Sequence, residues 1–245
     1  MRKKIIIIFV IILLAAIGYF VIFKKDKNSN EQQTVENSQQ DAAATVDAVE
    51  ASKYTIDNES SIYYVVNKRR PLPLDYVPSG LTTPNVPLAE EDGTKESMLR
   101  GEAASAAEML FAEAGQKGYS LILASGYRSA DLQAYYYNGY VKRDGQAAAD
   151  KYSAQPGTSE HQTGLAFDIS RKDRRCYLEI CFGQTPEGKW LAENSYKYGL
   201  VIRYPQGKEN VTGYQHEPWH FRYVGMDLAE KVYESGKTLE EYFNL

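Results

Sequence analysis

The chain has 245 residues and a formal net charge of −4, from 28 lysines and arginines against 32 aspartates and glutamates. No long basic block occurs along it, so nothing in the charge pattern argues for nucleic-acid binding. Hydrophobic residues make up 43% of the sequence and tyrosine contributes 20 residues, which is enough for a core in one large or two small domains.

An uncharged apolar run lies near the N-terminus, from residue 5 to residue 23, with lysines or arginines on both sides. At about 1.5 Å per residue, this run nearly spans a hydrocarbon core of about 30 Å. It is longer than the apolar part of a signal peptide and shows no clear small-residue cleavage site. We therefore expect residues 1–25 to be a retained membrane anchor, with a signal segment as the alternative.

Residues 26–53 are rich in Gln, Asn, Ser, Glu, Asp and Ala and contain no aromatic residue. This composition predicts a disordered tether, for which a reach of about 30 Å is expected. A spacer without a selected length is the alternative. The folded domain is then residues 54–245. Lysine and arginine counts are similar on both sides of the apolar run, so the positive-inside rule does not decide its orientation. We infer the orientation from the function that the motifs of the folded part imply, which places the catalytic domain outside the cytoplasm.

Helix and strand patterns alternate irregularly within residues 54–245. Apolar periodicity and capping residues predict helices over residues 95–114, after Ser129, over 186–199, over 226–235 and over 239–243. Short β-rich runs predict strands at 119–124, 165–169, 201–204 and 219–224, with 62–67 as a strand or an extended arm. Because no strict β-α-β repeat occurs, we predict an α+β fold, a small antiparallel sheet with flanking helices.

Cys176 and Cys181 are the only cysteines in the sequence. Disulfides are permitted outside the cytoplasm, and we expect a local one here, although so short a loop gains little stability from closure. Free thiols are the alternative. The spacing and the lack of a second cysteine pair make both residues poor zinc ligands.

Two separated stretches combine histidines with carboxylates. The first contains His161 and Asp168, and the second contains Glu217 and His220. A catalytic zinc takes three nitrogen or oxygen ligands and keeps one position open. We therefore predict His161, Asp168 and His220 as zinc ligands. Glu217 is then free to act as a general base, while structural hydrogen bonding is the alternative role for each of these side chains.

The segment from His216 to His220 also matches the H-E-x-x-H pattern of helical zinc peptidases. In those enzymes both histidines lie on one helix face, which would make His216 a ligand here. Pro218 stands between them, and proline inside a helix costs about 3 kcal/mol or more. The residues that follow are β-rich. We therefore expect a strand, in which His216 is not a ligand.

Several motifs, taken in order along the chain, resemble those of VanY-type, LdcB-like zinc D-alanyl carboxypeptidases. They are Ser125–Ser129, Ser159-x-His161 with Asp168, and Glu217–Gly225. The likeness covers roughly residues 63–245. It implies a compact α+β zinc-peptidase domain, shared in outline with lysostaphin-like enzymes and hedgehog domains. It also implies removal of a terminal D-alanine from peptidoglycan stem peptides.

The resemblance also implies roles by position. The zinc ligands become the two histidines and the aspartate named above, and Glu217 becomes the base. Arg128 becomes the residue that polarises the scissile carbonyl or holds the substrate carboxylate, and Ser159 becomes a contact to the substrate terminus. His216 receives no role.

Some alternatives remain open at this point. A catalytically silent peptidoglycan-binding module of the same fold is the second function, but such a module would lack a ligand or the base. The resemblance leans towards L,D-specificity over D,D-specificity without deciding it.

We expect a monomer with the stem peptide and the membrane as partners, and no nucleic acid.

Overall fold

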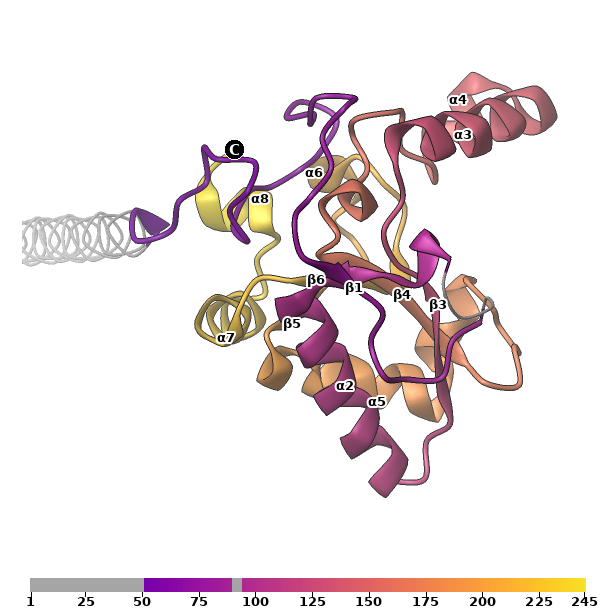
Figure 1. Cartoon of the computed structure of the whole chain (residues 1–245), viewed down its shortest axis with the longest axis vertical. Helices are drawn as coiled ribbons and strands as arrows, with labels where there is room; N and C mark the ends of the chain where they lie inside the picture. The colour runs from indigo at the N-terminus through magenta and orange to yellow at the C-terminus, as the bar shows by residue number, and fades with distance from the viewer. Residues whose placement is uncertain (1–50, 90–93) are drawn as a thin grey trace, which may run out of the picture. The chain divides into compact units, whose positions relative to one another are not determined.

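A computed structural model describes residues 51–89 and 94–245 (Figure 1). Tyr54–Leu245 forms one compact unit. The predicted anchor and nearly all of the predicted tether lie outside the described residues. Within the described ranges, no helix is both long and apolar enough to cross a membrane.

A four-stranded sheet with the strand order β3-β4-β6-β5 forms the centre of the unit. The strands are β3 (Leu121–Ser125), β4 (Ala166–Arg171), β5 (Leu200–Tyr204) and β6 (Glu217–Tyr223). Every neighbouring pair is antiparallel. A separate two-stranded ladder joins β1 (Leu81–Thr82) to β2 (Leu99–Arg100). β4 and β6 are the two inner strands, and nearly all of their residues are buried.

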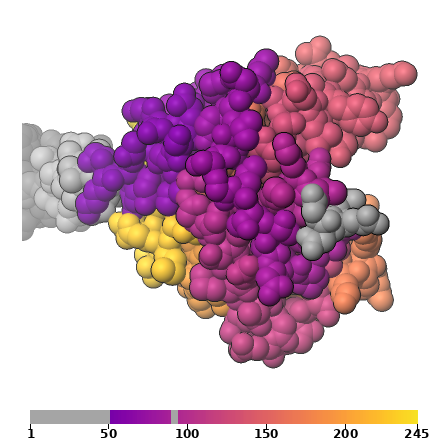
Figure 2. All heavy atoms as spheres, in the orientation of Figure 1, coloured from indigo at the N-terminus to yellow at the C-terminus, as the bar shows by residue number. Residues whose placement is uncertain are grey.

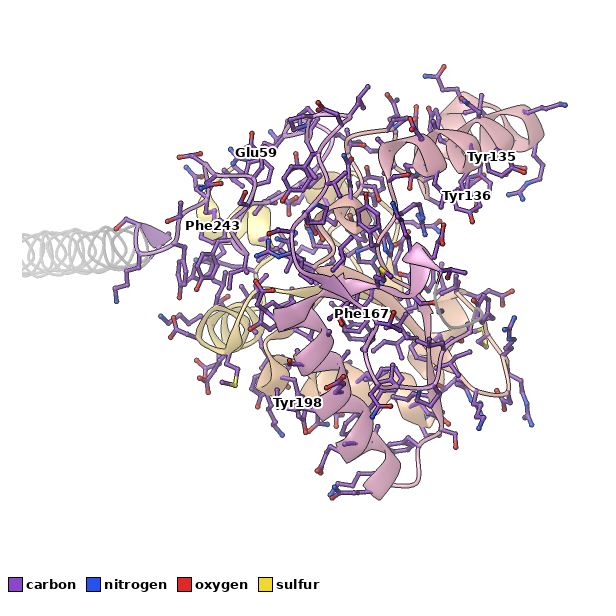
Figure 3. All side chains as sticks on the ribbon, in the orientation of Figure 1. Glu59, Tyr135, Tyr136, Phe167, Tyr198 and Phe243 are labelled. Atoms are coloured by element: carbon purple, nitrogen blue, oxygen red, sulfur yellow. A yellow bond between two sulfur atoms is a disulfide. The ribbon has the colours of Figure 1, made fainter. Side chains whose placement is uncertain are left out.

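Two helices, α2 (Gly101–Gln116) and α5 (Pro186–Asn194), lie together on one side of the sheet (Figure 1). Side chains alternate between the two faces of a strand. Phe167 of β4 and Phe221 of β6 therefore enter the same buried core as Leu110 of α2. Figure 3 shows Phe167 at the centre of the unit. The residues between these core positions face the other side of the sheet.

Helices α3 (Ala130–Asp144) and α4 (Gln146–Ala149) project from the body of the unit (Figures 1 and 2). In α3 only Ala130, Gln133 and Tyr137 are buried, while Tyr135 and Tyr136 lie on its outer part (Figure 3). Three further helices complete the unit, α6 (Glu209–Thr212), α7 (Met226–Ser235) and α8 (Leu239–Phe243). Short 3-10 helices are η1 (Lys95–Ser97), η2 (Glu160–Thr163), η3 (Ile180–Gln184) and η4 (Ser195–Tyr198).

The predicted α+β class is confirmed, and the predicted strands occur close to their expected positions. Ser129 caps α3 as expected, because its Oγ accepts a hydrogen bond from the Leu132 amide. The helix predicted from residue 95 is wrong at its start, since α2 begins at Gly101. Leu99 and Arg100 are extended instead because they pair with β1.

Two further expectations are resolved in the described residues. The segment 62–67 forms no strand, since its first two residues lie in a turn and Asn67 makes only an isolated bridge with Arg70; Val65 and Val66 are fully buried. Cys176 and Cys181 form a disulfide, as expected.

Candidate active site

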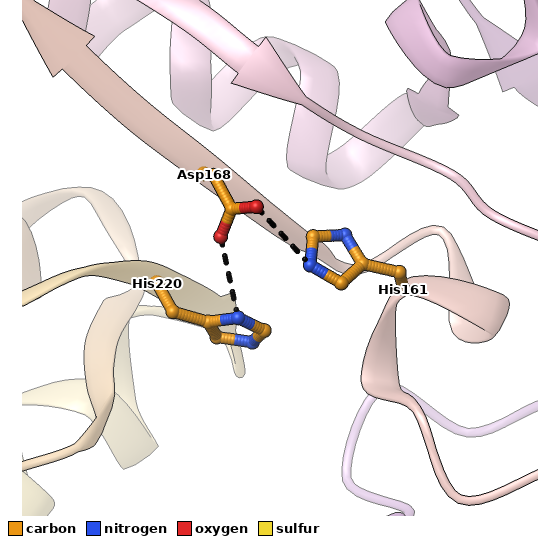
Figure 4. Close-up of side chains that lie close together, drawn as sticks. All are labelled: His161, Asp168 and His220. Atoms are coloured by element: carbon orange, nitrogen blue, oxygen red, sulfur yellow. Dashed lines mark ion pairs between the residues drawn. The ribbon is translucent and has the colours of Figure 1, made fainter. Parts of the chain in front are cut away.

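Three buried side chains from three elements meet on the face of the sheet opposite the hydrophobic core (Figure 4). Asp168 of β4 and His220 of β6 are cross-strand partners. His161 lies in η2, just before β4. Asp168 Oδ2 is 3.4 Å from His161 Nε2, and Asp168 Oδ1 is 3.3 Å from His220 Nδ1. One donor atom from each residue lies within 4.8 Å of the others.

A tight turn at Gly164 brings His161 back towards β4. Gly164 has a positive φ of 68°, a conformation that glycine adopts without steric cost. An added Cβ would lie 2.9 Å from Leu81 Cδ2 and 3.3 Å from the Arg100 backbone nitrogen, so these neighbours would have to shift. The glycine between the predicted ligands therefore lets a short connection place both on one site.

The donor set fits a zinc ion, which binds imidazole nitrogen and carboxylate oxygen. His161 Nδ1 lies 2.7 Å from the Gly126 carbonyl oxygen, so this nitrogen carries the hydrogen and Nε2 faces the cluster unprotonated. Asp168 Oδ1 is buried without a hydrogen-bond partner. Burial would raise the pKa of Asp168, but the two imidazoles outweigh it and hold the pKa well below its usual range. An anionic carboxylate between two imidazoles suits a cation.

Carboxylates surround His220. Besides Asp168, Glu217 Oε2 lies 3.6 Å from Nδ1 and Glu160 Oε2 lies 3.8 Å from Nε2. Burial would lower the pKa of His220, but these acids outweigh it and raise the pKa to about 9. The environment therefore favours positive charge at this position, which is what a bound metal ion would supply.

Glu217 is the first residue of β6 and its side chain is buried beside the cluster. Burial raises the pKa of Glu217 to about 8, although His220 and Arg128 act in the opposite direction. A carboxylate with a raised pKa next to a reaction centre can take up and release a proton near neutral pH. This arrangement fits the general base predicted from the sequence.

Arg128 lies just before α3 and its guanidinium is held from two sides. Nη1 donates to Gln133 Oε1 at 3.0 Å, and Nη2 donates to Ser125 Oγ at 2.8 Å. The group also stacks on the Tyr136 ring, 5.3 Å from the ring centroid. Its Nε is buried and has no hydrogen-bond partner. Because Arg128 lines the cavity, its fixed charge is suited to a carbonyl or carboxylate of a ligand.

A cavity of about 210 Å³ joins these groups. Its lining contains all six residues predicted as ligands, base or substrate contacts, which are Arg128, Ser159, His161, Asp168, Glu217 and His220. Aromatic side chains form much of the remaining wall, namely Tyr140, Tyr152, Tyr204, Tyr214 and Trp219. The structure thus brings together residues from η2, β4, β6 and the α3 start.

The alternative helical interpretation of residues 216–220 is wrong, because Glu217 to His220 belong to strand β6. His216 lies outside that strand and is only half-buried. Its Nδ1 is 2.9 Å from the Tyr204 carbonyl oxygen. Among the described residues, the group with metal-ligand geometry at this site contains Asp168 and not His216.

Sequence reasoning missed a buried acid, Glu160, behind the cluster. Its Oε1 accepts hydrogen bonds from Arg203 Nε at 2.8 Å and from Arg222 Nη1 at 2.9 Å. Burial would raise the pKa of Glu160, but the two guanidinium groups hold it well below its usual range. The sequence offered one signal of a buried charge at this place. Arg222 follows His220 by two residues in a strand, so the two side chains lie on the same face of the sheet.

Known proteins are similar to this chain in sequence. The VanY family, described as D-alanyl-D-alanine carboxypeptidase, matches residues 96–226. A putative carboxypeptidase of Bacillus subtilis, YodJ, is 44% identical over 198 residues, which is 81% of this chain and 71% of the relative. The family match spans the residues that line the cavity.

Solved structures agree in fold. The LdcB LD-carboxypeptidase aligns with a TM-score of 0.73 at 44% identity, over 77% of this chain and 88% of its own. A VanY D,D-pentapeptidase from a VanB-type vancomycin resistance cassette, solved in complex with Zn(II), aligns with a TM-score of 0.61 at 35% identity, over 76% of this chain and 100% of its own. The resemblance inferred from the motifs is confirmed, and the chain belongs to the VanY family of D-alanyl-D-alanine carboxypeptidases.

Proposed function

We propose that this protein is a zinc-dependent carboxypeptidase that removes the C-terminal D-alanine from peptidoglycan stem peptides. One observation carries the proposal: a nitrogen-nitrogen-oxygen donor cluster, a buried carboxylate and a guanidinium line one cavity. Membership of the VanY family and the Zn(II) complex of a structural relative support it.

We assign the metal to His161, Asp168 and His220, whose donor atoms converge. When bound, zinc polarises a carbonyl and lowers the pKa of a water towards about 7. Glu217 lies beside the converging atoms and takes the proton of the attacking water. It then passes that proton to the nitrogen of the leaving D-alanine, so one carboxylate acts first as base and then as acid.

Arg128 and Ser159 are assigned to the substrate. The Arg128 guanidinium can stabilise the negative charge that develops on the scissile carbonyl, or hold the free carboxylate of the peptide terminus. Ser159 is buried in the same cavity and supplies a hydroxyl that can donate to and accept from the terminus. A free carboxylate is what distinguishes a carboxypeptidase substrate from an internal peptide bond.

We further propose L,D-specificity, that is, cleavage of the tetrapeptide whose terminal D-alanine follows an L-centre. The LdcB LD-carboxypeptidase is similar at 44% identity and a TM-score of 0.73, against 35% and 0.61 for the VanY D,D-pentapeptidase. Separate digestion of a tetrapeptide and a pentapeptide, with products identified by mass, tests this. Preferred release of D-alanine from the pentapeptide would contradict it.

We also propose that residues 1–25 anchor the protein in the cell membrane, that residues 26–53 tether it, and that the domain acts outside the cytoplasm as a monomer. The apolar run in the sequence and the wall-directed activity of the family support this location. Membrane fractionation of the full chain, with protease added to intact cells, tests it. A protein found in the soluble fraction would contradict the anchor.

The central experiment separates an enzyme from a silent binding module. The purified protein is analysed for zinc per chain and for D-alanine release from a stem peptide. We expect about one zinc per chain, as in other catalytic sites with three protein ligands, together with D-alanine release that a chelator abolishes. Zinc-loaded protein that binds the peptide without releasing D-alanine would favour the silent module.

A further inference from the structure

Glu160 ends in a buried oxygen that no donor satisfies. The side chain is fully enclosed, and the residue is 1% exposed. Oε1 accepts hydrogen bonds from Arg203 and Arg222, whereas Oε2 has no hydrogen-bond partner. His220 Nε2 is also buried without a partner, and it lies 3.8 Å from that oxygen. Two unsatisfied polar atoms therefore face each other behind the cluster.

The opposite edge of the His220 ring faces the donor cluster. Its Nδ1 is 3.3 Å from Asp168 Oδ1 and 3.6 Å from Glu217 Oε2. A neutral imidazole that binds a metal through one nitrogen carries its hydrogen on the other. If Nδ1 is the ligand atom, the hydrogen of His220 is on Nε2, where Glu160 supplies the acceptor.

His161 shows the reverse arrangement. Its Nε2 faces Asp168, and its Nδ1 lies against the Gly126 carbonyl oxygen at 2.7 Å. The two histidines thus approach the site through different nitrogens, and each has an oxygen acceptor behind its other nitrogen. For His161 this acceptor is a backbone carbonyl, and for His220 it is a carboxylate.

We propose that Glu160 is a positioning residue, which accepts a hydrogen bond from His220 Nε2–H and thereby presents Nδ1 to the zinc ion. This inference rests on the proposed function, because it concerns a zinc ligand. A carboxylate behind a metal-bound histidine fixes the tautomer and the ring orientation. The 3-10 helix η2 then supplies one ligand, His161, and the residue that orients another.

The position of Glu160 is itself fixed by buried partners. Arg203 also binds Glu240 through both terminal nitrogens, at 2.9 and 2.6 Å. Arg222 Nη2 donates to the carbonyl oxygens of Ile62 and Tyr64. The network holds two cations, Arg203 and Arg222, and two anions, Glu160 and Glu240, so its charges balance. If the Glu160 carboxylate turned away, buried guanidinium groups would be left unpaired.

The first test uses the unaltered protein. Histidine labelled with ¹⁵N reports which ring nitrogen carries hydrogen in the zinc-loaded state. The chain has three histidines, and the His216→Gln variant lacks the signals of His216, so the signals that remain belong to His161 and His220. We expect hydrogen on Nε2 of His220 and on Nδ1 of His161. Hydrogen on Nδ1 of His220 would overturn the inference and leave the proposed function intact. A protein that takes up no zinc would instead overturn the proposed function.

The second test compares Glu160→Gln with Glu240→Gln. Each change removes one carboxylate charge from the same network around Arg203, but only Glu160 faces His220. We expect both variants to melt at lower temperature than the unaltered protein. Zinc affinity, measured by chelator competition, should fall about 10–100-fold in Glu160→Gln and stay unchanged in Glu240→Gln.

Equal losses of zinc affinity in the two variants would show a purely structural role and would overturn the inference. An unchanged affinity in Glu160→Gln would do the same. If Glu160→Gln does not fold, the nitrogen assignment on the unaltered protein decides the matter alone.

Discussion

Asp168 and His220 are paired in register across the two inner strands, with Oδ1 of one 3.3 Å from Nδ1 of the other. Their neighbours Phe167 and Phe221 are paired in the same way and enter the core. Since side chains alternate, a slip of one residue would turn the aromatic pair out of the core and the polar pair into it. Burial of the phenylalanines therefore fixes the geometry of the proposed ligands.

The first prediction concerns those ligands. Replacement of His161, Asp168 or His220 with alanine should lower zinc content and D-alanine release together, because each removes one of three converging donors. His216→Ala is the control and should keep its zinc, since His216 lies against the Tyr204 carbonyl oxygen. Metal analysis and turnover are measured on all four variants. Zinc loss in His216→Ala with retention in Asp168→Ala would show that the ligand assignment is wrong.

The second prediction separates binding from catalysis. Glu217→Gln keeps the size of the side chain but cannot accept the proton of the attacking water. We expect near-normal zinc content and a rate reduced by about 10²–10⁴, the usual cost of losing a general base. Turnover comparable to that of the unaltered protein would exclude Glu217 as the base.

The third prediction concerns Arg128. Because its guanidinium is fixed by Ser125 and Gln133 and lines the cavity beside the cluster, Arg128→Ala should lower kcat/KM by about 10²–10³ through lost stabilisation of developing charge. The matched control is Arg143→Ala. Arg143 also stacks on a tyrosine, Tyr140, but is exposed. If both variants keep full kcat/KM with the peptide substrate, Arg128 plays no part in the reaction.

Local signals explain which parts of the fold could be predicted. Ser129 and the Thr185-Pro186 pair act on backbone groups within a few residues, so they predicted helix starts correctly. The start of α2 could not be predicted in this way, because Leu99 is extended by pairing with Thr82, which is distant in sequence. The apolar periodicity that predicted the helix is present in α2, but the pairing of β1 with β2 keeps Leu99 outside the helix.

The same distinction applies to the site. Histidine, aspartate and glutamate in two short motifs indicated a metal centre, because few other structures need that combination. Glu160 gave no such signal, although it adjoins His161. Its partners Arg203 and Arg222 are 43 and 62 residues away in sequence, and only the sheet brings these charges together.

The fourth prediction concerns the disulfide. Cys176 and Cys181 enclose Leu178, which lines the cavity and has a positive φ of 51°. Replacing both cysteines with serine should release this loop at a cost of about 2 kcal/mol in the chain-entropy estimate, which is at the low end for disulfides because the loop is short. The proposed ligands lie on other elements. We therefore expect KM to rise more than kcat falls, in steady-state kinetics on a stem peptide.

A reducing agent should reproduce this effect in the unaltered protein and have none on the double serine variant. An unchanged KM after reduction would mean that the loop does not shape the substrate site.

The fifth prediction concerns stability and pH. Glu240 is 2% exposed and binds Arg203 through both oxygens. Burial would raise the pKa of Glu240, but the Arg203 charge outweighs it and lowers the pKa below its ordinary value of 4.5. The folded state thus binds this proton more weakly than the unfolded state. The pair stabilises the protein fully above about pH 4.5 and loses that effect as pH falls through the lowered pKa.

Glu240→Gln should therefore lower the free energy of unfolding at pH 7 by about 3–5 kcal/mol, because it leaves a buried guanidinium under-paired. The free energies of unfolding of this variant and of the unaltered protein should differ less below pH 4.5. Urea unfolding at pH 7 and near pH 3.5 measures both values. Glu113→Gln, which removes an exposed pair with Lys117, is the control and should cost less than about 1 kcal/mol. If the loss of unfolding free energy in Glu240→Gln is the same at both pH values, the charge of Glu240 does not contribute to folding.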